Sequence, residues 1–308
     1  MNALYSHETV LKQEAVDALR VEGSGVYVDG TFGRGGHSRL ILEQLGDSGR
    51  LYVIDCDPEA IAEAQQLAAE DDRVTVCAGT FGELQELLSD QGVTAVDGLL
   101  FDFGVSSPQI DQAERGFSFQ RSGPLDMRMD NSQGLSAAEW LASAEPQEMR
   151  QVFWRYGEEK NANRIARKIA EVRMEKPLQT TAELAQLVAE INFRDHKNPA
   201  TRVFQAIRIH INKELEQIEQ VLPQACDLLL PGGRLVVISF HSLEDRIVKR
   251  FMKKRSKTAP VDRRMPVEIN QEQPELRLVG KPLKAVDVDA NVRARSAIMR
   301  VAEKRHVD

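Results

Sequence analysis

The chain has 308 residues, of which 42% are hydrophobic and 28% charged, a composition typical of a folded globular protein with one large core or two smaller ones. Its formal net charge of -7 argues against a protein that coats nucleic acid through bulk charge. The sequence has no run of about 18 apolar residues and no signal-peptide core near its start, so we expect a cytoplasmic protein without a membrane span. Cys56, Cys77 and Cys226 lack the spacing of a zinc site or a disulfide framework, and we expect no bound metal.

Short apolar runs alternate with helix-like stretches in the first third of the chain. The runs at residues 25–29, 51–55, 74–77, 96–102 and, much later, 234–240 predict buried strands. The stretches at residues 38–45, 58–69 and 81–88 predict the helices between them. This alternation predicts an α/β fold with a doubly wound parallel sheet.

After Pro108 the strand pattern stops and a series of helix-like stretches begins. Helices are expected at residues 137–141, 148–156, 161–174, 182–191 and 201–230. The last of these is expected to end at Pro231-Gly232-Gly233. Two late runs, at residues 276–279 and 296–302, could close the sheet as a hairpin, and the proline-rich, charged segment 256–275 is expected to be a loop. We therefore expect a core domain made of residues 1–110 and 204–308, with an inserted helical substrate-recognition domain at residues 111–203.

A glycine-dense stretch, residues 29–37, directly follows the first predicted strand. Gly33, Gly35 and Gly36 allow the backbone to adopt positive φ and to approach a ligand closely. The second predicted strand ends at Asp55, where an acidic side chain would bind the two hydroxyls of a ribose. The pair of features predicts a cofactor that contains a nucleoside.

The spacing of these glycines distinguishes between classes of nucleotide. It does not fit the dinucleotide pattern G-x-G-x-x-G, and no lysine follows as a phosphate-binding loop would require, so NAD and ATP are disfavoured. An acid four residues before a G-x-G pair is similar to the first motif of class I methyltransferases, whose cofactor is S-adenosylmethionine. Phe81, after the third strand, could stack on the adenine, although an ordinary core phenylalanine is the alternative.

The fourth predicted strand ends at Asp102, at the sheet edge where doubly wound folds bind ligands. Enzymes that methylate exocyclic base nitrogens carry Ser, Asp or Asn, then Pro-Pro and an aromatic residue, at this place. Ser107-Pro108 is similar to that motif, whereas Gln109 departs from it. Because the lone pair of a base amine is delocalised into the ring, hydrogen-bond acceptors must orient it. Asp102, Ser107 and Pro108 are therefore the catalytic candidates, and Asp102 or Ser107 could also serve as a base.

Two other enzyme classes are disfavoured. Asp102-Phe103-Gly104 spells a kinase triplet, but the chain lacks a kinase glycine loop with a strand lysine and a His-Arg-Asp loop. Residues 241–245 contain a histidine, a hydroxyl and carboxylates, but no Gly-x-Ser-x-Gly elbow presents a nucleophile. We expect His241 to line the cleft, or Ser242 and Asp245 to cap the following helix.

Cations gather in two places in this acidic chain. Basic residues occur at Arg246, Lys249, Arg250, Lys253, Lys254, Arg255 and Lys257, and again at Arg293, Arg295, Arg300, Lys304 and Arg305. Such runs can contact phosphate groups or can form a solvated helix face, and the sequence allows both interpretations.

The turn-rich segment 114–129 is expected to face RNA. Arginines and phenylalanines are interleaved in it, and such residues meet phosphates and stack on bases; they are Arg115, Arg121, Arg128, Phe117 and Phe119. A packed connector is the alternative reading.

Several long strings together resemble a known family. They are GTFGRGGHS at residues 30–38, GVSSPQ at 104–109, ERGFSF at 114–119, GPLDMRM at 123–129, PATRVFQAIRI at 199–209, ISFHSLEDRIVK at 238–249 and RARS at 293–296. In this order they look like the ribosomal small-subunit methyltransferase H family, also called MraW. The resemblance spans nearly the whole chain and is poor only at about residues 256–291.

The resemblance implies a class I, Rossmann-like methyltransferase core with an inserted helical domain. It implies N4-methylation of one cytidine in the decoding region of 16S ribosomal RNA of the small subunit, in bacterial cytoplasm, with S-adenosylmethionine as cofactor. By the same resemblance, the cofactor would be contacted by Gly35, Gly36, His37, Asp55, Phe81, Asp102 and Gln109.

Two other functions and several details stay open at this stage. Ser107-Pro108 alone would permit a DNA amino-methyltransferase, and a cofactor-regulated RNA-binding assembly protein without catalysis is possible as well. The sequence leaves open whether the substrate is naked RNA or an assembled subunit, and which oligomer the chain forms.

Overall fold

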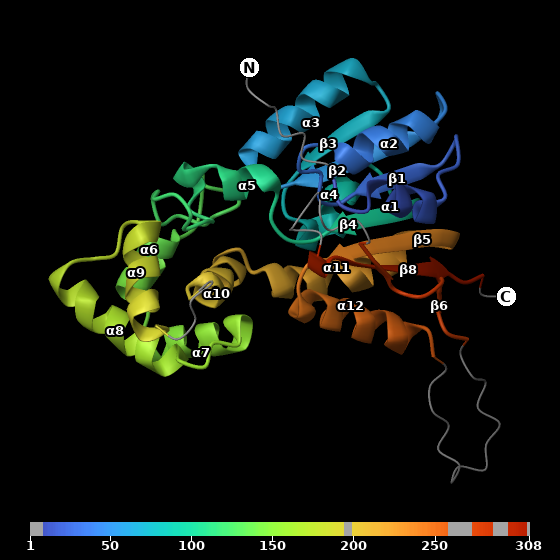
Figure 1. The fold of residues 1–308 in the computed structure, drawn as a ribbon. Helices are drawn as coiled ribbons and strands as arrows, with labels where there is room; N and C mark the ends of the chain where they lie inside the picture. Colours follow the sequence, from blue (N-terminus) through green and yellow to red (C-terminus); the bar gives the residue numbers. More distant parts are fainter. Residues whose placement is uncertain (1–8, 194–198, 258–272, 286–294, 307–308) are drawn as a thin grey trace, which may run out of the picture. The chain divides into compact units, whose positions relative to one another are not determined.

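The computed structural model describes residues 9–193, 199–257, 273–285 and 295–306. The chain divides into two compact units, in which unit 1 contains Met1–Gly104 and Leu215–Asp308, and unit 2 contains Val105–Glu214. In Figure 1 unit 1 is coloured blue to teal and orange to red, and unit 2 green to yellow. No helix within the described residues is long and apolar enough to cross a lipid bilayer.

Unit 1 is built on one mixed sheet with the strand order β3-β2-β1-β4-β5-β8-β6, and β7 also pairs with β8. The strands are β1 (Val26–Asp29), β2 (Arg50–Asp55), β3 (Val74–Ala78), β4 (Val96–Asp102), β5 (Leu229–Ser239), β6 (Leu276–Leu278), β7 (Leu283–Lys284) and β8 (Ile298–Lys304). The first five are parallel, and β8 runs antiparallel to β5 and to β6. The predicted doubly wound α/β fold and the predicted antiparallel late pair are therefore confirmed.

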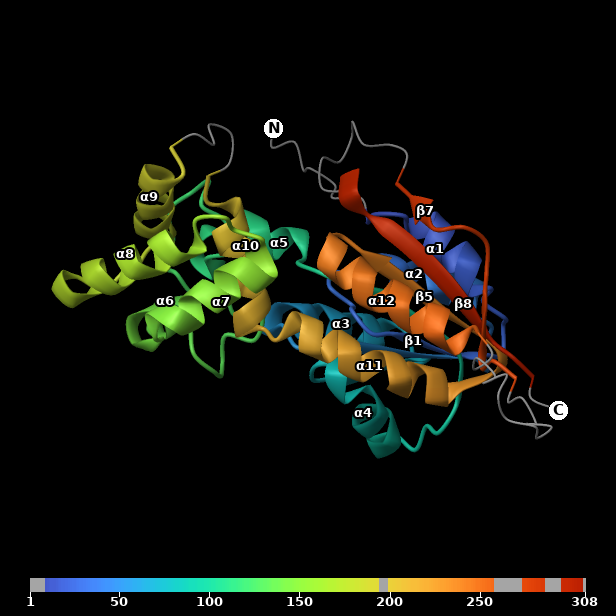
Figure 2. The ribbon, with the colours of Figure 1, turned by 90° about the horizontal axis from the view of Figure 1, so that it is seen from below.

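Helices cover both faces of this sheet. They are α1 (Lys12–Leu19), α2 (Gly36–Gln44), α3 (Pro58–Glu70), η1 (Phe81–Glu83), α4 (Leu84–Asp90), α11 (Glu214–Leu228) and α12 (Ser242–Arg255). Apolar side chains of α1, α2 and α3 pack with those of the central strands in one core cluster. Figure 2 shows α4, α11 and α12 together on the other side of the sheet. The two-sided cover agrees with the almost uniformly buried pattern of β4, since a central parallel strand must be apolar on both faces.

Unit 2 is helical, as the sequence predicts. Its elements are α5 (Ser107–Asp111), η2 (Ala113–Arg115), α6 (Ala137–Ser143), α7 (Pro146–Gly157), α8 (Ala162–Glu175), α9 (Thr181–Ile191) and α10 (Thr201–Ile211). The expected domain boundary after residue 203 would divide α10. Helix α10 packs against α7 and α6 instead, so its whole length belongs to unit 2.

Two expectations for the segment 201–240 were wrong. The long helix is two helices, α10 and α11, separated at Asn212 and Lys213, and Lys213 has a left-handed φ of 51°. Pro231-Gly232-Gly233 lies inside β5 instead of ending a helix, and the β4–β5 register shifts between Val96 and Gly98. Of the expected loop 256–275, residues 258–272 lie outside the described part of the chain.

Candidate functional site

Three parallel strands of unit 1 each end in an aspartate. Asp29 ends β1, Asp55 ends β2 and Asp102 ends β4. Strand β1 pairs with both of the other strands, so the three carboxyl ends lie along one edge of the sheet. This is the edge at which doubly wound sheets bind ligands.

Asp29 is completely buried and is held by groups that follow it in the chain. The Ser38 hydroxyl donates to its Oδ2 at 2.6 Å, and the Thr31 N–H donates to its Oδ1 at 3.2 Å. Burial raises the pKa of the Asp29 carboxyl to about 6, although both hydrogen bonds act in the opposite direction. The carboxylate of Asp29 is therefore costly to ionise in the absence of a positively charged neighbour.

The glycine turn links the end of β1 to the end of β2. The Gly33 N–H donates to Asp55 Oδ2 at 2.8 Å. Gly33 and Gly35 have left-handed φ angles of 57° and 72°, a conformation that side chains with a Cβ rarely adopt. A Cβ built on Gly33 would have no atom within 4 Å, whereas one on Gly36 would lie 1.9 Å from Thr9 Oγ1. Gly33 thus borders open space, and Gly36 is needed for close packing of the chain itself.

Asp55 also organises the chain that follows it. Its Oδ1 accepts the Asp57 N–H at 2.9 Å, and Asp57 in turn caps α3 by accepting the Glu59 N–H. Burial raises the pKa of Asp55, while the hydrogen bonds from Asp57 and Gly33 lower it. Each carboxylate oxygen can accept a second hydrogen bond, so Asp55 keeps acceptor capacity for ligand hydroxyls.

Asp102 has the least satisfied carboxyl group of the three. Its N–H donates to Thr31 Oγ1 at 2.6 Å, which ties β4 to the glycine turn. Its Oδ1 is buried and has no hydrogen-bond partner within the described residues. Burial, and then the nearby carboxylates of Asp29 and Glu244, raise the pKa of Asp102 well above its usual range. A buried acceptor of this kind is expensive unless a donor or a cation reaches it.

An aromatic cluster lies next to the end of β4. The ring centroid of Phe81 is 5.2 Å from that of Phe103 and 6.3 Å from that of Phe101. Phe101 and Phe103 are fully buried, whereas Phe81 is half-buried. Phe81 is therefore the member of the cluster that keeps ring surface available to a ligand.

His37 lies in the first turn of α2 and is buried. Burial, and then the charge of Lys12, lower the pKa of its imidazole to about 4, so the ring is neutral near pH 7. Its Nε2 has no hydrogen-bond partner in the described part of the chain. His37 thus adds a second unsatisfied polar atom to this region of unit 1.

The remaining predicted site residues belong to unit 2. Ser107 and Pro108 begin α5 and are half-buried, and Gln109 is buried. Gln109 Oε1 accepts the Ser106 N–H at 2.9 Å in a capping box, so its side chain helps to start this short helix.

The prediction that Ser242 and Asp245 cap α12 was wrong. His241 is the N-cap, and the carboxylate of buried Glu244 accepts the N–H groups of Phe240 and His241. Asp245 instead forms an ion pair with Arg300, with Nε and Oδ1 2.7 Å apart. The signal was present in the sequence, because an acid three residues after a polar N-cap is typical of a capping box.

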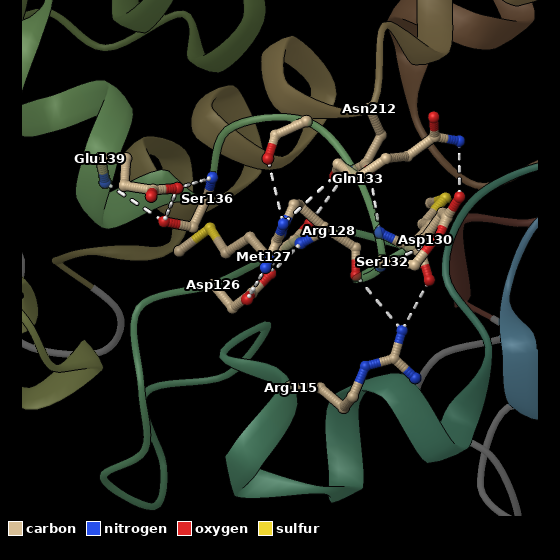
Figure 3. Close-up of polar contacts among 12 residues, drawn as sticks. Arg115, Asp126, Met127, Arg128, Asp130, Ser132, Gln133, Ser136, Glu139 and Asn212 are labelled. Carbon is tan, nitrogen blue, oxygen red and sulfur yellow. Dashed lines mark hydrogen bonds and ion pairs between the residues drawn. The ribbon is translucent and has the colours of Figure 1, made fainter.

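Of the arginines in segment 114–129 that were expected to face RNA, buried Arg115 contradicts the expectation, and Arg128 is engaged within unit 2. Arg115 is buried and donates to the carbonyl oxygens of Arg128 and Met129 (Figure 3). Arg128 forms a two-pronged ion pair with Asp126, at 2.7 and 2.8 Å, and donates to the carbonyl oxygens of Gln133 and Gly134. These guanidinium groups stabilise the segment from within, as the packed-connector reading expects.

An aromatic residue of the same segment is also turned inward. The Phe119 ring meets the Phe204 ring edge to face, with centroids 4.9 Å apart. Arg121, in contrast, is exposed and donates to the Asp111 carbonyl. Of the predicted RNA-facing residues, Arg121 remains a candidate.

Two further residues of the site were not singled out from the sequence. Thr31 accepts the Asp102 N–H, and Glu244 adds a buried carboxyl near Asp102. The position of Thr31 within the glycine turn was visible in the sequence. Its pairing with a residue 71 positions later was not.

Known proteins match this chain over almost its whole length. Residues 4–305 match the sequence profile of the MraW methylase family. A protein of Dechloromonas aromatica named ribosomal RNA small subunit methyltransferase H is 55% identical, with 97% of this chain and 98% of the relative covered. Proteins of the same name from Neisseria meningitidis and Shewanella loihica are 56% and 55% identical, over 97% and 99% of this chain and 93% and 99% of theirs.

A solved structure titled as a putative rRNA methylase from Clostridium thermocellum is more distant, with 14% identity, a TM-score of 0.44 and 96% of both chains covered. The family assignment rests on the sequence matches, which combine high identity with nearly complete coverage. The chain belongs to the MraW methylase family.

Proposed function

We propose that this protein methylates N4 of one cytidine in the decoding region of 16S ribosomal RNA, with S-adenosylmethionine as the methyl donor. The observation that carries the proposal is the family match over residues 4–305, together with relatives of at least 55% identity named ribosomal RNA small subunit methyltransferase H. Methyl transfer to small-subunit ribosomal RNA follows from those names. The cytidine, its N4 atom and the decoding region are what the family resemblance implies.

The residues at the sheet edge fit this cofactor. It has a ribose with two hydroxyls, and Asp55 has acceptor capacity for them. It is also a cation, and the carboxyl groups of buried Asp29 and half-buried Asp55 and Asp102, all with raised pKa values, would be stabilised in their ionised form by a nearby positive charge. The Oδ1 of Asp102, which has no hydrogen-bond partner among the described residues, would gain such a partner.

The other cofactor residues have distinct roles in the proposal. Gly33 and Gly35 keep the turn in its left-handed conformation, Gly33 leaves room beside the backbone, and Gly36 allows α2 to start there. Phe81 offers a ring face to the adenine. His37 supplies a neutral ring nitrogen. Gln109 is assigned to the cofactor from the family resemblance alone.

When bound, S-adenosylmethionine supplies a methyl group activated by an adjacent sulfonium. The protein must hold the weakly nucleophilic amine in line with that group. Acceptors on the amino protons would localise its lone pair, and Asp102 and Ser107 are assigned to this task. Pro108 shapes the backbone that presents the target base, which must leave its stack to react. The chemistry requires neither a covalent nucleophile nor a metal.

The substrate partner in this proposal is 16S ribosomal RNA of the small subunit in bacterial cytoplasm. The test is transfer of tritium from labelled S-adenosylmethionine to small subunits isolated from a strain that lacks the protein, followed by nucleoside mass spectrometry. Naked 16S RNA and intact particles are compared side by side. N4-methylated cytidine, or its 2′-O-methylated form, supports the proposal, whereas label in another nucleoside contradicts the assigned target.

Two rivals give different results in the same assay. A DNA amino-methyltransferase would label duplex oligonucleotides in preference to ribosomal particles. A non-catalytic assembly protein would bind the cofactor and the particle without transferring a methyl group to either form of the RNA.

A further inference from the structure

Among the helices and strands of the described residues, α12 carries the strongest positive charge. The proposed site does not use its cations. Five exposed cations lie on the helix and a sixth lies just past its end: Arg246, Lys249, Arg250, Lys253, Lys254 and Lys257. Their spacing of three, four, seven and eight residues places them along one stripe of the helix. The opposite stripe, with Glu244, Val248 and Met252, is buried against the sheet.

The stripe itself contains no acidic residue. Between Arg246 and Lys257 the sequence contains no Asp or Glu. The two acids of the first turn are engaged elsewhere, because Glu244 is buried in the cap and Asp245 is paired with Arg300. No ion pair within the described residues involves Lys249, Arg250, Lys253 or Lys254.

Such a stripe is costly to the helix itself. Cations four residues apart repel one another, by about 0.2 to 0.5 kcal/mol for each pair, and the stripe contains pairs such as Arg246 with Arg250 and Lys249 with Lys253. Attraction to the helix dipole offsets part of this cost in the last turn, where Lys253 and Lys254 lie. It does not act on Arg246, Lys249 and Arg250. A solvated face that served solubility alone would mix charges of both signs.

The direction of the helix relates the stripe to the site. Helix α12 starts immediately after β5, at the carboxyl edge of the sheet, and Glu244 in its first turn lies near Asp102. From there it runs back along the sheet for 14 residues, or about 20 Å. The stripe therefore extends from the neighbourhood of the site to the outside of unit 1, where Figure 2 shows α12.

We propose that this stripe binds the phosphate backbone of the ribosomal RNA next to the target nucleotide. The inference rests on the proposed function and adds the surface that holds the substrate. In a chain with a net charge of -7, a local row of six cations provides attraction for a polyanion that the protein as a whole does not.

The test compares two triple variants with the same net charge. In the first, Lys249→Gln, Arg250→Gln and Lys253→Gln neutralise the stripe, and glutamine preserves helix propensity. In the second, Arg20→Gln, Lys281→Gln and Lys284→Gln neutralise three exposed cations elsewhere in unit 1. The KM for small subunits, kcat, the affinity for S-adenosylmethionine and the melting temperature are measured between 50 and 200 mM salt.

We expect the stripe variant to raise the KM for the particle on the order of ten-fold at low salt, with kcat and cofactor affinity unchanged. The slope of log affinity against log salt falls in magnitude by about 2, since each lost contact to single-stranded RNA removes about 0.7. The control variant keeps the KM and slope of the parent. Equal behaviour of the two variants overturns the inference, as does a fall in kcat or cofactor affinity without a change in slope.

Failure of the proposed function is distinguishable from failure of the stripe. If the unmodified protein methylates no ribosomal RNA, the function fails, while filter binding of the particle over the same salt range still tests the stripe. Vesicles that contain phosphatidylglycerol serve as a second polyanion. Loss of vesicle binding in the stripe variant, with particle affinity unchanged, overturns RNA as the partner.

Discussion

The backbone N–H of Gly33 donates to Oδ2 of Asp55 at 2.8 Å, so the turn after β1 and the end of β2 form one structure. The carboxylate of Asp55 thereby orders the turn and remains able to accept further hydrogen bonds. This relationship leads to two predictions that separate ligand binding from folding.

Replacement of Asp55 by alanine is expected to weaken S-adenosylmethionine binding by about ten- to a hundred-fold, because hydrogen bonds to a charged acceptor contribute about 1.5 to 3 kcal/mol. Isothermal titration calorimetry measures the effect. The control is Asp57→Ala, which removes the cap of α3 and should lower stability by about 1 kcal/mol. If Asp57→Ala weakens cofactor binding as strongly, Asp55 acts only through the fold.

Substitution of Gly33 by asparagine should reduce cofactor affinity more than it reduces stability. Asparagine tolerates a left-handed backbone, but its side chain would enter the open space beside Gly33. Gly92 has a similar φ of 73° and equally open surroundings, in a turn after α4. Gly92→Asn is therefore a matched control, and it should leave the cofactor affinity unchanged. Equal losses of affinity in the two variants would count against a ligand beside Gly33.

The stability of the protein without cofactor should depend on pH through Asp29. Its pKa is raised to about 6 in the fold, from an ordinary value of 3.8. Between these values the folded state binds more protons than the unfolded state, so the free energy of unfolding decreases as pH rises from about 4 to about 6 and stays low above that range. Lowering the pH through this window therefore restores stability.

The variant Asp29→Asn removes this titration. Its free energy of unfolding, relative to that of the parent, should grow as pH rises from 4 to 7, by an amount on the order of 3 kcal/mol. Urea unfolding at several pH values measures it, with exposed Asp47→Asn as the control. A difference between variant and parent that is constant with pH would show that Asp29 ionises without cost.

Loss of Arg128 should destabilise unit 2. Its guanidinium is paired with Asp126 and donates to two carbonyl groups, and its side chain is only 19% exposed. Arg128→Ala is expected to cost about 1 to 3 kcal/mol, with a strong coupling to Asp126→Asn in a double-mutant cycle. Arg164→Ala, at an exposed position of α8, is the control and should change the free energy of unfolding by less than about 0.5 kcal/mol.

The same variant decides between the two readings of segment 114–129. If Arg128 contacts RNA directly, its loss raises the KM for the particle without lowering the melting temperature. The structure leads us to expect both effects together, because the segment loses its internal support.

Local sequence patterns predicted most elements of the sheet and helices. The strands that end in Asp29, Asp55 and Asp102 were recognisable because each is a short apolar run followed by a polar residue. Helix α3 was recognisable from Pro58 in its first turn. These signals arise from residues that are close together in the chain. The capping box of Glu244 is equally local, although it was not predicted.

The break between α10 and α11 depends on contacts between distant residues. The side chain of Asn212 accepts the N–H of Met129 at 2.7 Å and donates to the carbonyl of Met127 at 2.9 Å. Both partners are more than 80 positions away in the sequence. The helical periodicity continues across this point, so it predicted one helix where tertiary hydrogen bonds stabilise two.

The sequence by itself determined the doubly wound architecture, the glycine turn and the acids at the ends of the strands, since hydrophobic periodicity and turn chemistry are local properties. Only the tertiary structure decided which polar groups of the described residues are satisfied by the protein and which are not. Arg115 and Arg128 lie in a segment whose composition is typical of RNA binding, but their side chains turn inward to carbonyl and carboxylate oxygens. Asp102, in contrast, retains a buried oxygen without a partner among the described residues. Burial and long-range hydrogen bonds set these outcomes, because a buried polar group must be paired with whatever the fold brings within reach.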